Sequence, residues 1–348
     1  MQPKKYLFYV SQNYSYAILR PLQTEIKKRG DIVKWFLHGN EVNSDYIQKD
    51  EVVLNDILSA VAYKPDAVFV PGNVVPSFLS GIKVAVFHGF NSGKLNRKGR
   101  EDHFNIRGCF DLYCTQGPNT TENFQWLANK HQHFLVLETG WPALDPLFSV
   151  KREYNNSTPT VLMCSTFSRN LTCAPILFDK IKELSSTGKW SWLVQFHPKM
   201  DRKIVEQYKS IQSEYLTFVE TDNVIPLLQK ADAMLCDTSS VLTMFLLQGK
   251  PVVTFNNISP DEYLLNIDDP GKLEESLELA LKRPEALMEK ISLFIKNTHP
   301  TQDGMASCRV LDKVENMIDT DERPLKAKPM NLIRSFKMRK SLGYWKLK

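Results

Sequence analysis

Short apolar runs alternate with amphipathic segments along most of this chain, and this alternation constrains the fold more than any other feature. The runs at 6–10, 67–71, 160–165 and 233–237 are apolar enough for buried strands, whereas the segments between them have helical spacing. Strands that alternate with helices build βαβ units, so a mainly parallel sheet is expected. The alternation pauses in the polar stretch 150–158 and then resumes, which predicts two Rossmann-like α/β domains.

The 348 residues suit two domains of ordinary size, with a cleft between them as the expected place for chemistry. We expect domains at 1–150 and 151–318, followed by a basic amphipathic tail at 319–348. The expected strands are 6–10, 33–37, 67–71, 83–89, 112–117, 134–140, 160–165, 192–198, 216–220, 233–237 and 251–255. The expected helices are 17–29, 51–63, 120–130, 173–185, 202–213, 224–230, one opened by residues 238–240, 271–283, 285–296 and 305–317.

Composition excludes several unusual classes of protein. Apolar residues make up 43% and charged residues 24%, which are ordinary globular values. The six cysteines form no C-x-x-C pair, and several lie in apolar runs, so we expect reduced thiols. The N-terminus lacks the features of a signal peptide, and no apolar run is long enough to span a bilayer. We therefore expect a cytoplasmic protein.

Basic charge is concentrated at the C-terminus. Residues 325–348 hold eight Lys or Arg and no acid, and without them the formal charge of +5 becomes −3. Aromatic and aliphatic residues are interleaved with these cations, which suits an anionic membrane surface. A solvated tail and a nucleic-acid arm are the alternatives, but the remaining body has no basic excess for nucleic acid. We expect peripheral attachment to the inner face of the cell membrane.

The stretch 233–255 carries the most informative motif. A buried strand ends at Asp237, and Thr238, Ser239 and Ser240 then open an apolar helix. The free N–H groups and positive dipole end of such a helix, together with two hydroxyls, suit a diphosphate. The alternative is that Asp237, Thr238 and Ser239 only cap the helix.

Two histidines are expected at strand ends. Pro198 stops a strand directly after His197, so the imidazole is expected at the rim of the sheet, where it can donate to a phosphate oxygen beside Lys199. His88 ends a strand of the first half, where it could take a proton from an acceptor hydroxyl, and Gly89 allows a sharp turn. The alternative for each is a histidine without a chemical task.

No metal and no cofactor are expected. The acidic pair Asp319 and Asp321 lies in the linker before the tail, where solvated charge explains it better than a Mg²⁺ ligand. The sequence also has neither a P-loop nor the dinucleotide-binding glycine fingerprint.

Seven short strings together resemble the CDP-glycerol glycerophosphotransferases of teichoic-acid-like polymer synthesis. They match in order and spacing over nearly all of residues 80–315. The strings are FHG (87–89), GWPALDPLF (140–148), VLMCSTFSR (161–169), FHP (196–198), CDTSSV (236–241), KPVV (250–253) and QDGMASCRV (302–310).

The resemblance implies a GT-B architecture of two facing Rossmann-like domains, an N-terminal acceptor domain and a C-terminal nucleotide-donor domain. It implies transfer of glycerol phosphate from CDP-glycerol to a hydroxyl of a polysaccharide or lipid-linked acceptor. His88 resembles the family's base, His197 its phosphate-binding histidine, and Ser239 with Ser240 its diphosphate-binding helix start. The matched strings also contribute the candidates Arg169, Asp145 and Asp303, and Asn91 is a further candidate just after the first string.

The sequence departs from the family pattern near both predicted sites. It has Phe-His-Gly-Phe-Asn at 87–91 where the family has Trp-His-Gly-Thr-Pro, and it also differs at 140–145 and 165–169. Two alternatives therefore remain. One is a glycosyltransferase that uses a CMP- or UDP-sugar in capsule or lipopolysaccharide synthesis, and the other is a protein like the nucleotide-sugar 2-epimerases or a non-catalytic binding protein.

Overall fold

The computed structural model describes residues 2–90, 102–149, 158–221 and 223–346. The chain forms two compact units. Unit 1 contains Met1–Ser149 and Thr298–Lys348, and unit 2 contains Val150–Asn297. The first division follows Ser149, and the polar stretch begins at residue 150. We expected the second domain to end at residue 318. In the structure unit 2 ends at Asn297, because the chain returns to unit 1 at Thr298.

The sheet of unit 1 has six parallel strands in the order β2-β1-β3-β4-β5-β6. All six correspond to predicted strands. Their bounds are β1 (Lys5–Val10), β2 (Ile32–Leu37), β3 (Ala67–Val70), β4 (Ile82–Ala85), β5 (Leu112–Thr115) and β6 (Leu135–Glu138).

Helices cover both faces of this sheet. α1 (Ser15–Lys28) and α11 (Ala306–Asp319) pack together on one face, where Arg29 pairs with Asp312 and Glu315. The opposite face is covered by α2 (Ile57–Tyr63), α3 (Pro118–His131) and α12 (Leu332–Leu342). Unit 1 also contains α4 (Asp145–Phe148) and the short 3-10 turns Ser44–Tyr46 and Pro142–Leu144.

The helix predicted from residue 51 begins only at Ile57. Residues before it are extended because the Trp35 N–H donates to the Val52 carbonyl (2.8 Å) and the Leu54 N–H to the Trp35 carbonyl (2.8 Å). Asp56 then caps the helix by accepting from the Ser59 N–H at 2.7 Å.

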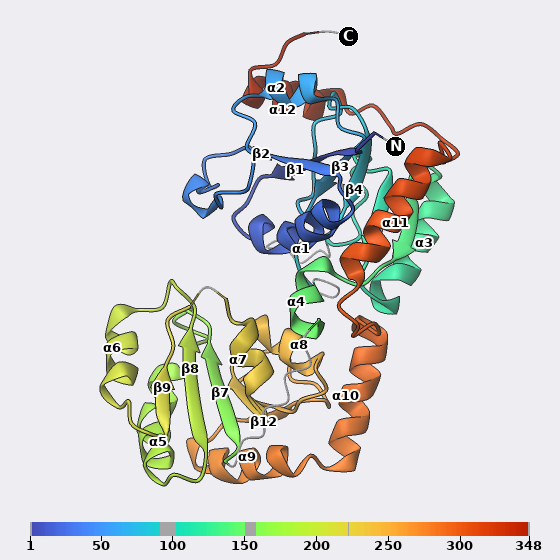
Figure 1. Ribbon diagram of the computed structural model, residues 1–348. Helices are drawn as coiled ribbons and strands as arrows, with labels where there is room; N and C mark the ends of the chain where they lie inside the picture. Colours follow the sequence, from blue (N-terminus) through green and yellow to red (C-terminus); the bar gives the residue numbers. More distant parts are fainter. Residues whose placement is uncertain (1, 91–101, 150–157, 222, 347–348) are drawn as a thin grey trace. The chain divides into compact units, whose positions relative to one another are not determined.

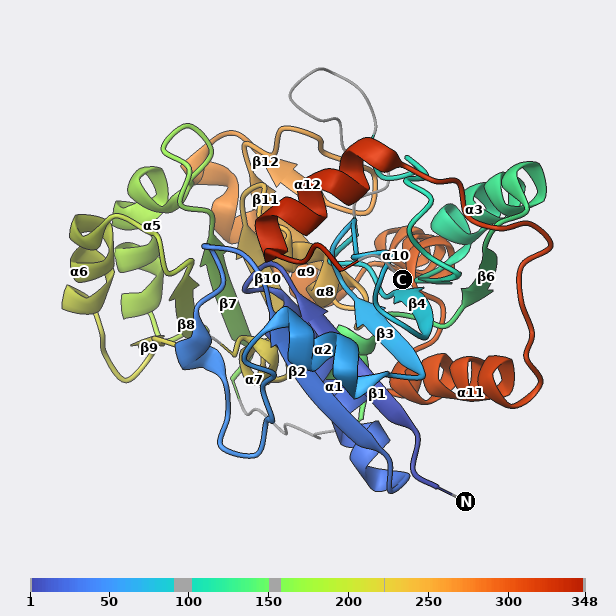
Figure 2. The same cartoon turned by 90° about the horizontal axis from the view of Figure 1, so that it is seen from above.

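The predicted tail is a folded part of unit 1. The connection from β3 to β4 contains no helix, and α12 covers the apolar face beside it (Figures 1 and 2). Tyr344 is only 7% exposed and stacks on Phe78 with 4.5 Å between ring centroids. Sequence reasoning missed this docking because the inward-facing Met338 and Leu342 are separated by basic residues.

Unit 2 contains a second sheet of six parallel strands, in the order β12-β11-β10-β7-β8-β9. Followed from β9, this is the 3-2-1-4-5-6 order of doubly wound nucleotide-binding folds. The strands are β7 (Thr160–Ser165), β8 (Ser191–Phe196), β9 (Leu216–Phe218), β10 (Ala233–Cys236), β11 (Val252–Phe255) and β12 (Leu265–Ile267). β12 was not predicted from the sequence.

The helices of unit 2 also lie on both faces of their sheet (Figure 1). The main core joins one face to α5 (Ala174–Ser186), α6 (Arg202–Ser210) and α9 (Leu273–Lys282). On the other face lie α7 (Ile225–Lys230) and α8 (Val241–Leu246). After β12 the chain forms a 3-10 turn (Pro270–Lys272), then α9 and finally α10 (Glu285–Thr298). The predicted α/β class with two Rossmann-like sheets is confirmed. Within the described residues, no helix is both long and apolar enough to cross a bilayer.

Candidate functional site

The chain order reverses once in each sheet, and the predicted histidines lie at the strand ends near these reversals. In unit 1 the switch falls between β1 and β3, and in unit 2 between β7 and β10. Open α/β sheets bind ligands outside the carboxyl ends of strands at such switch points. Each unit therefore has a candidate site at the position that its topology favours.

The unit 1 site consists of His88, Tyr14 and Pro71. His88 follows β4, but its Nδ1 lies 3.0 Å from the Pro71 carbonyl oxygen at the end of β3. Its ring stacks on Tyr14, which follows β1, with 5.0 Å between centroids. A carbonyl oxygen can only accept, so Nδ1 carries the proton and Nε2 has the free lone pair. That tautomer is the one that a general base needs.

The backbone around His88 is unusual. Phe87 has a φ of +56°, a left-handed conformation that is uncommon for a bulky residue. Gly89 has a φ of +155°, and its carbonyl accepts from Gln116 Nε2 at 3.1 Å. Strained backbone is often found at functional sites, and here it turns the chain sharply on either side of His88. The candidate Asn91 lies outside the described residues.

The unit 2 site consists of His197, Phe167, Lys199, Asp237, Ser239 and Ser240. His197 is exposed, and its ring centroid lies 4.5 Å from that of Phe167 on the loop after β7. Its Nδ1 accepts from the Lys199 backbone N–H at 3.1 Å, so the neutral ring carries its proton on Nε2. Desolvation, and secondarily the charge of Lys199, lower the pKa of His197. The neutral ring of His197 donates from Nε2, so its tautomer is opposite to that of His88.

Asp237 turns inward rather than toward a ligand. Its fully buried carboxylate accepts from Ser165 Oγ (2.6 Å), the Thr166 N–H (3.0 Å) and the Cys173 N–H (3.2 Å). Burial raises the pKa of Asp237, and these hydrogen bonds oppose the shift. An anion in this place would repel a phosphate. Asp237 instead attaches the loop after β7 to the end of β10.

The three hydroxyl residues after Asp237 have different environments. Thr238 Oγ1 accepts from the Ile258 N–H at 3.2 Å and so holds the loop after β11. Ser240 occupies the N-cap position of α8 without a capping hydrogen bond from its side chain. Within the described part of the chain, the Ser239 and Ser240 hydroxyls have no hydrogen-bond partner. The capping alternative named Asp237, Thr238 and Ser239, whereas the N-cap position of α8 belongs to Ser240.

The predicted cations Arg169 and Lys199 are both exposed on loops that follow β7 and β8. Lys199 Nζ lies 5.8 Å from the Phe167 ring centroid. No carboxylate among the described residues forms an ion pair with either side chain. Both charges are available to an anionic ligand of unit 2.

Asp145 and Asp303 hold α11 in unit 1. Asp145 accepts from the Ala306 and Ser307 N–H groups, both at 2.8 Å, and burial raises its pKa. Asp303 pairs with Arg309 at 2.8 Å, and this interaction lowers its pKa. Their described hydrogen bonds go to α11 and the turn before it, so the structure gives them a structural task.

Several contributors to the two sites were missed from sequence. Tyr14, Pro71 and Phe167 are ordinary loop residues, and Ser165 and Cys173 belong to an apolar strand and a helix start. Pro71 and Ser165 had a usable signal, as the ends of the predicted strands 67–71 and 160–165. The described residues contain no cluster of His, Cys, Asp or Glu side chains suited to a metal ion.

The chain is similar to several solved structures over 92–94% of its length. A putative UDP-N-acetylglucosamine 2-epimerase from Listeria monocytogenes has 15% identity and a TM-score of 0.65, over 94% of this chain and all of that one. The wall teichoic acid polymerase TagF has 16% identity and a TM-score of 0.65, over 92% of this chain and 90% of that one. MnaA of S. aureus, solved with UDP, has 15% identity and a TM-score of 0.60, over 94% and 100%.

No family model matches this sequence. No curated protein matches it either. At these identities the similarity establishes the fold, and the neighbours are GT-B enzymes. The chain therefore has the GT-B fold.

Proposed function

We propose that this protein transfers glycerol phosphate, or a related polyol phosphate, from a CDP-activated donor to a hydroxyl group of a cell-surface polysaccharide or teichoic-acid-like acceptor. The observation that carries the proposal is the opposite tautomers of two strand-end histidines. His88 offers a free Nε2 lone pair, whereas His197 offers an Nε2–H donor. A phosphoryl transfer to an alcohol needs both, a base for the hydroxyl and a donor for the developing phosphate charge.

In the proposed reaction, His88 Nε2 takes the proton of the acceptor hydroxyl as its oxygen attacks the β-phosphorus. The new O–P bond forms while the bond from that phosphorus to the bridging oxygen breaks, and CMP leaves with the bridging oxygen. His197 Nε2–H, the Ser239 and Ser240 hydroxyls and the cations Arg169 and Lys199 would neutralise the leaving charge. Asp237 acts only as a positioning residue, because its carboxylate is engaged with the loop after β7.

The donor class rests on two independent supports. The short strings from FHG to QDGMASCRV resemble the CDP-glycerol glycerophosphotransferases, and TagF shares the fold. The direct test incubates the protein with CDP-glycerol, UDP-sugars or CMP-sugars and a hydroxylated acceptor, and measures release of the free nucleotide. We expect CMP release from CDP-glycerol that depends on acceptor.

His88→Gln should abolish that release while the affinity for CDP-glycerol stays within about twofold, since a base contributes to turnover rather than to donor binding. His131→Gln, at the end of α3, serves as the matched control and should retain wild-type activity. Normal turnover in His88→Gln would remove the base assignment.

A second candidate is a nucleotide-sugar 2-epimerase, because the Listeria monocytogenes neighbour has the same TM-score as TagF. An epimerase acts on one substrate and needs no acceptor hydroxyl. Conversion of UDP-N-acetylglucosamine without an added acceptor would favour it over the transferase.

The proposed reaction takes place at an anionic membrane surface that α12 contacts. Large apolar side chains are strongly exposed on and beside this helix, including Ile333 (72%), Phe336 (57%) and Trp345 (55%). Lys337, Lys340 and Lys346 are exposed with them. Apolar groups among cations are typical of a helix that lies in the interface of an anionic bilayer.

A further inference from the structure

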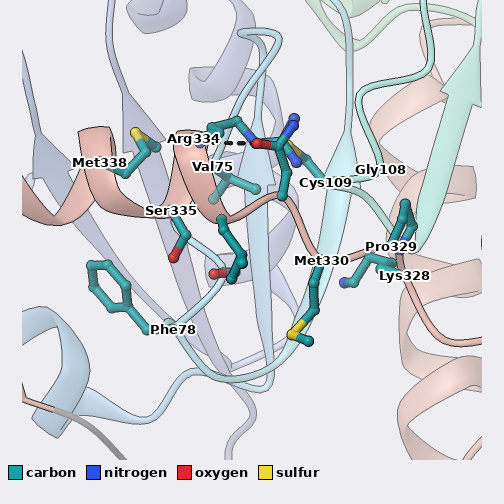
Figure 3. A pocket seen from close by; sticks show the side chains of 13 residues that line it. Val75, Phe78, Gly108, Cys109, Lys328, Pro329, Met330, Arg334, Ser335 and Met338 are labelled. Carbon is teal, nitrogen blue, oxygen red and sulfur yellow. Dashed lines mark hydrogen bonds between the residues drawn. The ribbon is translucent and has the colours of Figure 1, made fainter.

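A cavity of about 180 Å³ lies between α12 and the body of unit 1 (Figure 3). Val75, Phe78 and Cys109 contribute one side, and Met330, Ser335 and Met338 of the C-terminal segment contribute the other. The cavity therefore exists only because the C-terminal segment folds back onto the sheet.

Most of these lining groups are apolar or soft. Apolar cavities of about 150 Å³ in proteins stay dry and bind small hydrocarbons. The space under α12 is of that size, so it suits a short length of hydrocarbon chain rather than a sugar or a nucleotide.

Two cations also line the cavity, and they differ in their partners. Lys328 is neutralised by Asp111, with 2.6 Å between Nζ and Oδ1. Arg334 is half-buried, and no carboxylate in the described ranges pairs with its guanidinium group. A cation without a partner beside an apolar cavity matches a ligand with an anionic group next to a hydrocarbon chain.

The cavity opens beside exposed apolar side chains. Met330 is 89% exposed and Leu332 is 73% exposed, although both line the cavity. They continue directly into Ile333 and Phe336, the residues that we expect in the membrane interface. A ligand that reaches the cavity from a bilayer explains why its rim is apolar.

We propose that this cavity binds one anionic phospholipid, with part of an acyl chain under α12 and the phosphodiester at Arg334. The site extends the proposed membrane contact of α12, and it does not depend on the transfer reaction. It would give unit 1 a preference for a single lipid molecule in addition to diffuse attraction to anionic membranes.

The test uses short-chain lipids below the concentration at which they form micelles, so that no membrane surface is present. Isothermal titration calorimetry should detect binding of dihexanoyl phosphatidylglycerol. Dihexanoyl phosphatidylcholine, which lacks net negative charge, and glycerol 3-phosphate, which lacks the chains, should bind at least tenfold more weakly. Equal binding of glycerol 3-phosphate would mean that the apolar cavity is not used, and would overturn the proposal.

Three variants locate the ligand. Arg334→Gln should weaken binding of the short-chain lipid at least tenfold, and Ser335→Leu, which fills the cavity, should do the same. Lys340→Gln removes an equal charge from the exposed face of α12 and should bind as the wild type does. Equal losses in Lys340→Gln and Arg334→Gln, or unchanged binding in a folded Ser335→Leu, would contradict a built site.

Sedimentation with vesicles of phosphatidylcholine and phosphatidylglycerol separates this proposal from the membrane contact. Vesicle binding without short-chain lipid binding would overturn the cavity site alone. Absence of both would overturn the membrane contact as well, and the CMP-release assay reports on the transferase independently.

Discussion

Single contacts decide what each candidate residue can do. His197 donates from Nε2 only because its Nδ1 already accepts from the Lys199 backbone. A glutamine side chain can place an N–H group near the Nε2 position, whereas alanine cannot. We expect His197→Ala to lower turnover roughly 100-fold, the loss typical of a charge-stabilising donor, with partial recovery in His197→Gln. Steady-state CMP release checks this, and equal activity of the two variants would contradict the donor role.

Asp237 provides a second test at this scale. Ser165, Thr166 and Cys173 all donate to Oδ2 of Asp237, and the Thr166 N–H also approaches Oδ1 at 3.1 Å. We expect Asp237→Asn to lower the free energy of unfolding by about 1–3 kcal/mol, because the amide nitrogen that replaces one carboxylate oxygen cannot accept from a buried donor. Denaturant unfolding measures the loss. Unchanged stability would mean that the loop after β7 is held by other contacts.

At the scale of elements, α12 has a side that packs against unit 1 through the partly buried Met338 and Leu342, and an exposed side with a different task. Tyr344, just beyond the helix, fills the core of unit 1 against Phe78. We expect Tyr344→Ala to lower the free energy of unfolding by about 3 kcal/mol, the usual cost of removing a buried aromatic ring. A loose tail would show no change, so thermal unfolding distinguishes the two descriptions.

The exposed face of α12 should act on membranes without affecting stability. We expect the double variant Ile333→Ser, Phe336→Ser to weaken binding to anionic vesicles roughly tenfold or more, because two apolar side chains no longer enter the interface. Ile176→Ser serves as the control, since Ile176 is 55% exposed on α5 of unit 2. Equal binding by the double variant and this control would contradict contact through α12.

At the scale of the whole molecule, the chain leaves unit 1 near Ser149 and returns at Thr298. The return is tightly packed, because a Cβ on Gly117 would collide with the Thr298 carbonyl oxygen. His299 is 1% exposed, and its Nε2 accepts from the Trp141 N–H at 2.9 Å. Burial lowers the pKa of His299 from 6.5 to about 4.

This return point should make stability depend on pH. The unfolded chain binds a proton at His299 more readily than the folded chain does. The contribution of the neutral His299 to the free energy of unfolding is therefore complete above pH 6.5 and is lost as the pH falls through 4. We expect a loss of up to about 3 kcal/mol from this group. His299→Gln keeps an acceptor for Trp141 but does not titrate. The wild type should lose more stability than this variant between pH 6.5 and 4, and parallel curves would contradict the assignment.

Hydrophobic periodicity was sufficient for the αβ alternation and for eleven of the twelve strands, and Pro198 marked the end of the strand before His197. It was insufficient for β12, for the late start of α2 and for the docking of α12, because these depend on partners distant in sequence. Proline and glycine after a strand reveal where a side chain leaves the sheet. They do not reveal its neighbours.

The sequence by itself determined two parallel α/β sheets, since burial of regularly spaced apolar residues is a local pattern. It also determined that imidazoles and hydroxyls follow strands. Only the tertiary structure decided which ring nitrogen of each histidine holds the proton, because the Pro71 carbonyl and the Lys199 N–H reach those rings through folding. The tertiary structure also decided that the carboxylate of Asp237 faces inward and that the basic C-terminus forms a wall of unit 1. Each of these properties depends on hydrogen bonds, which need donor and acceptor atoms within about 3 Å of each other. The spacing of residues along the chain does not specify which atoms come that close.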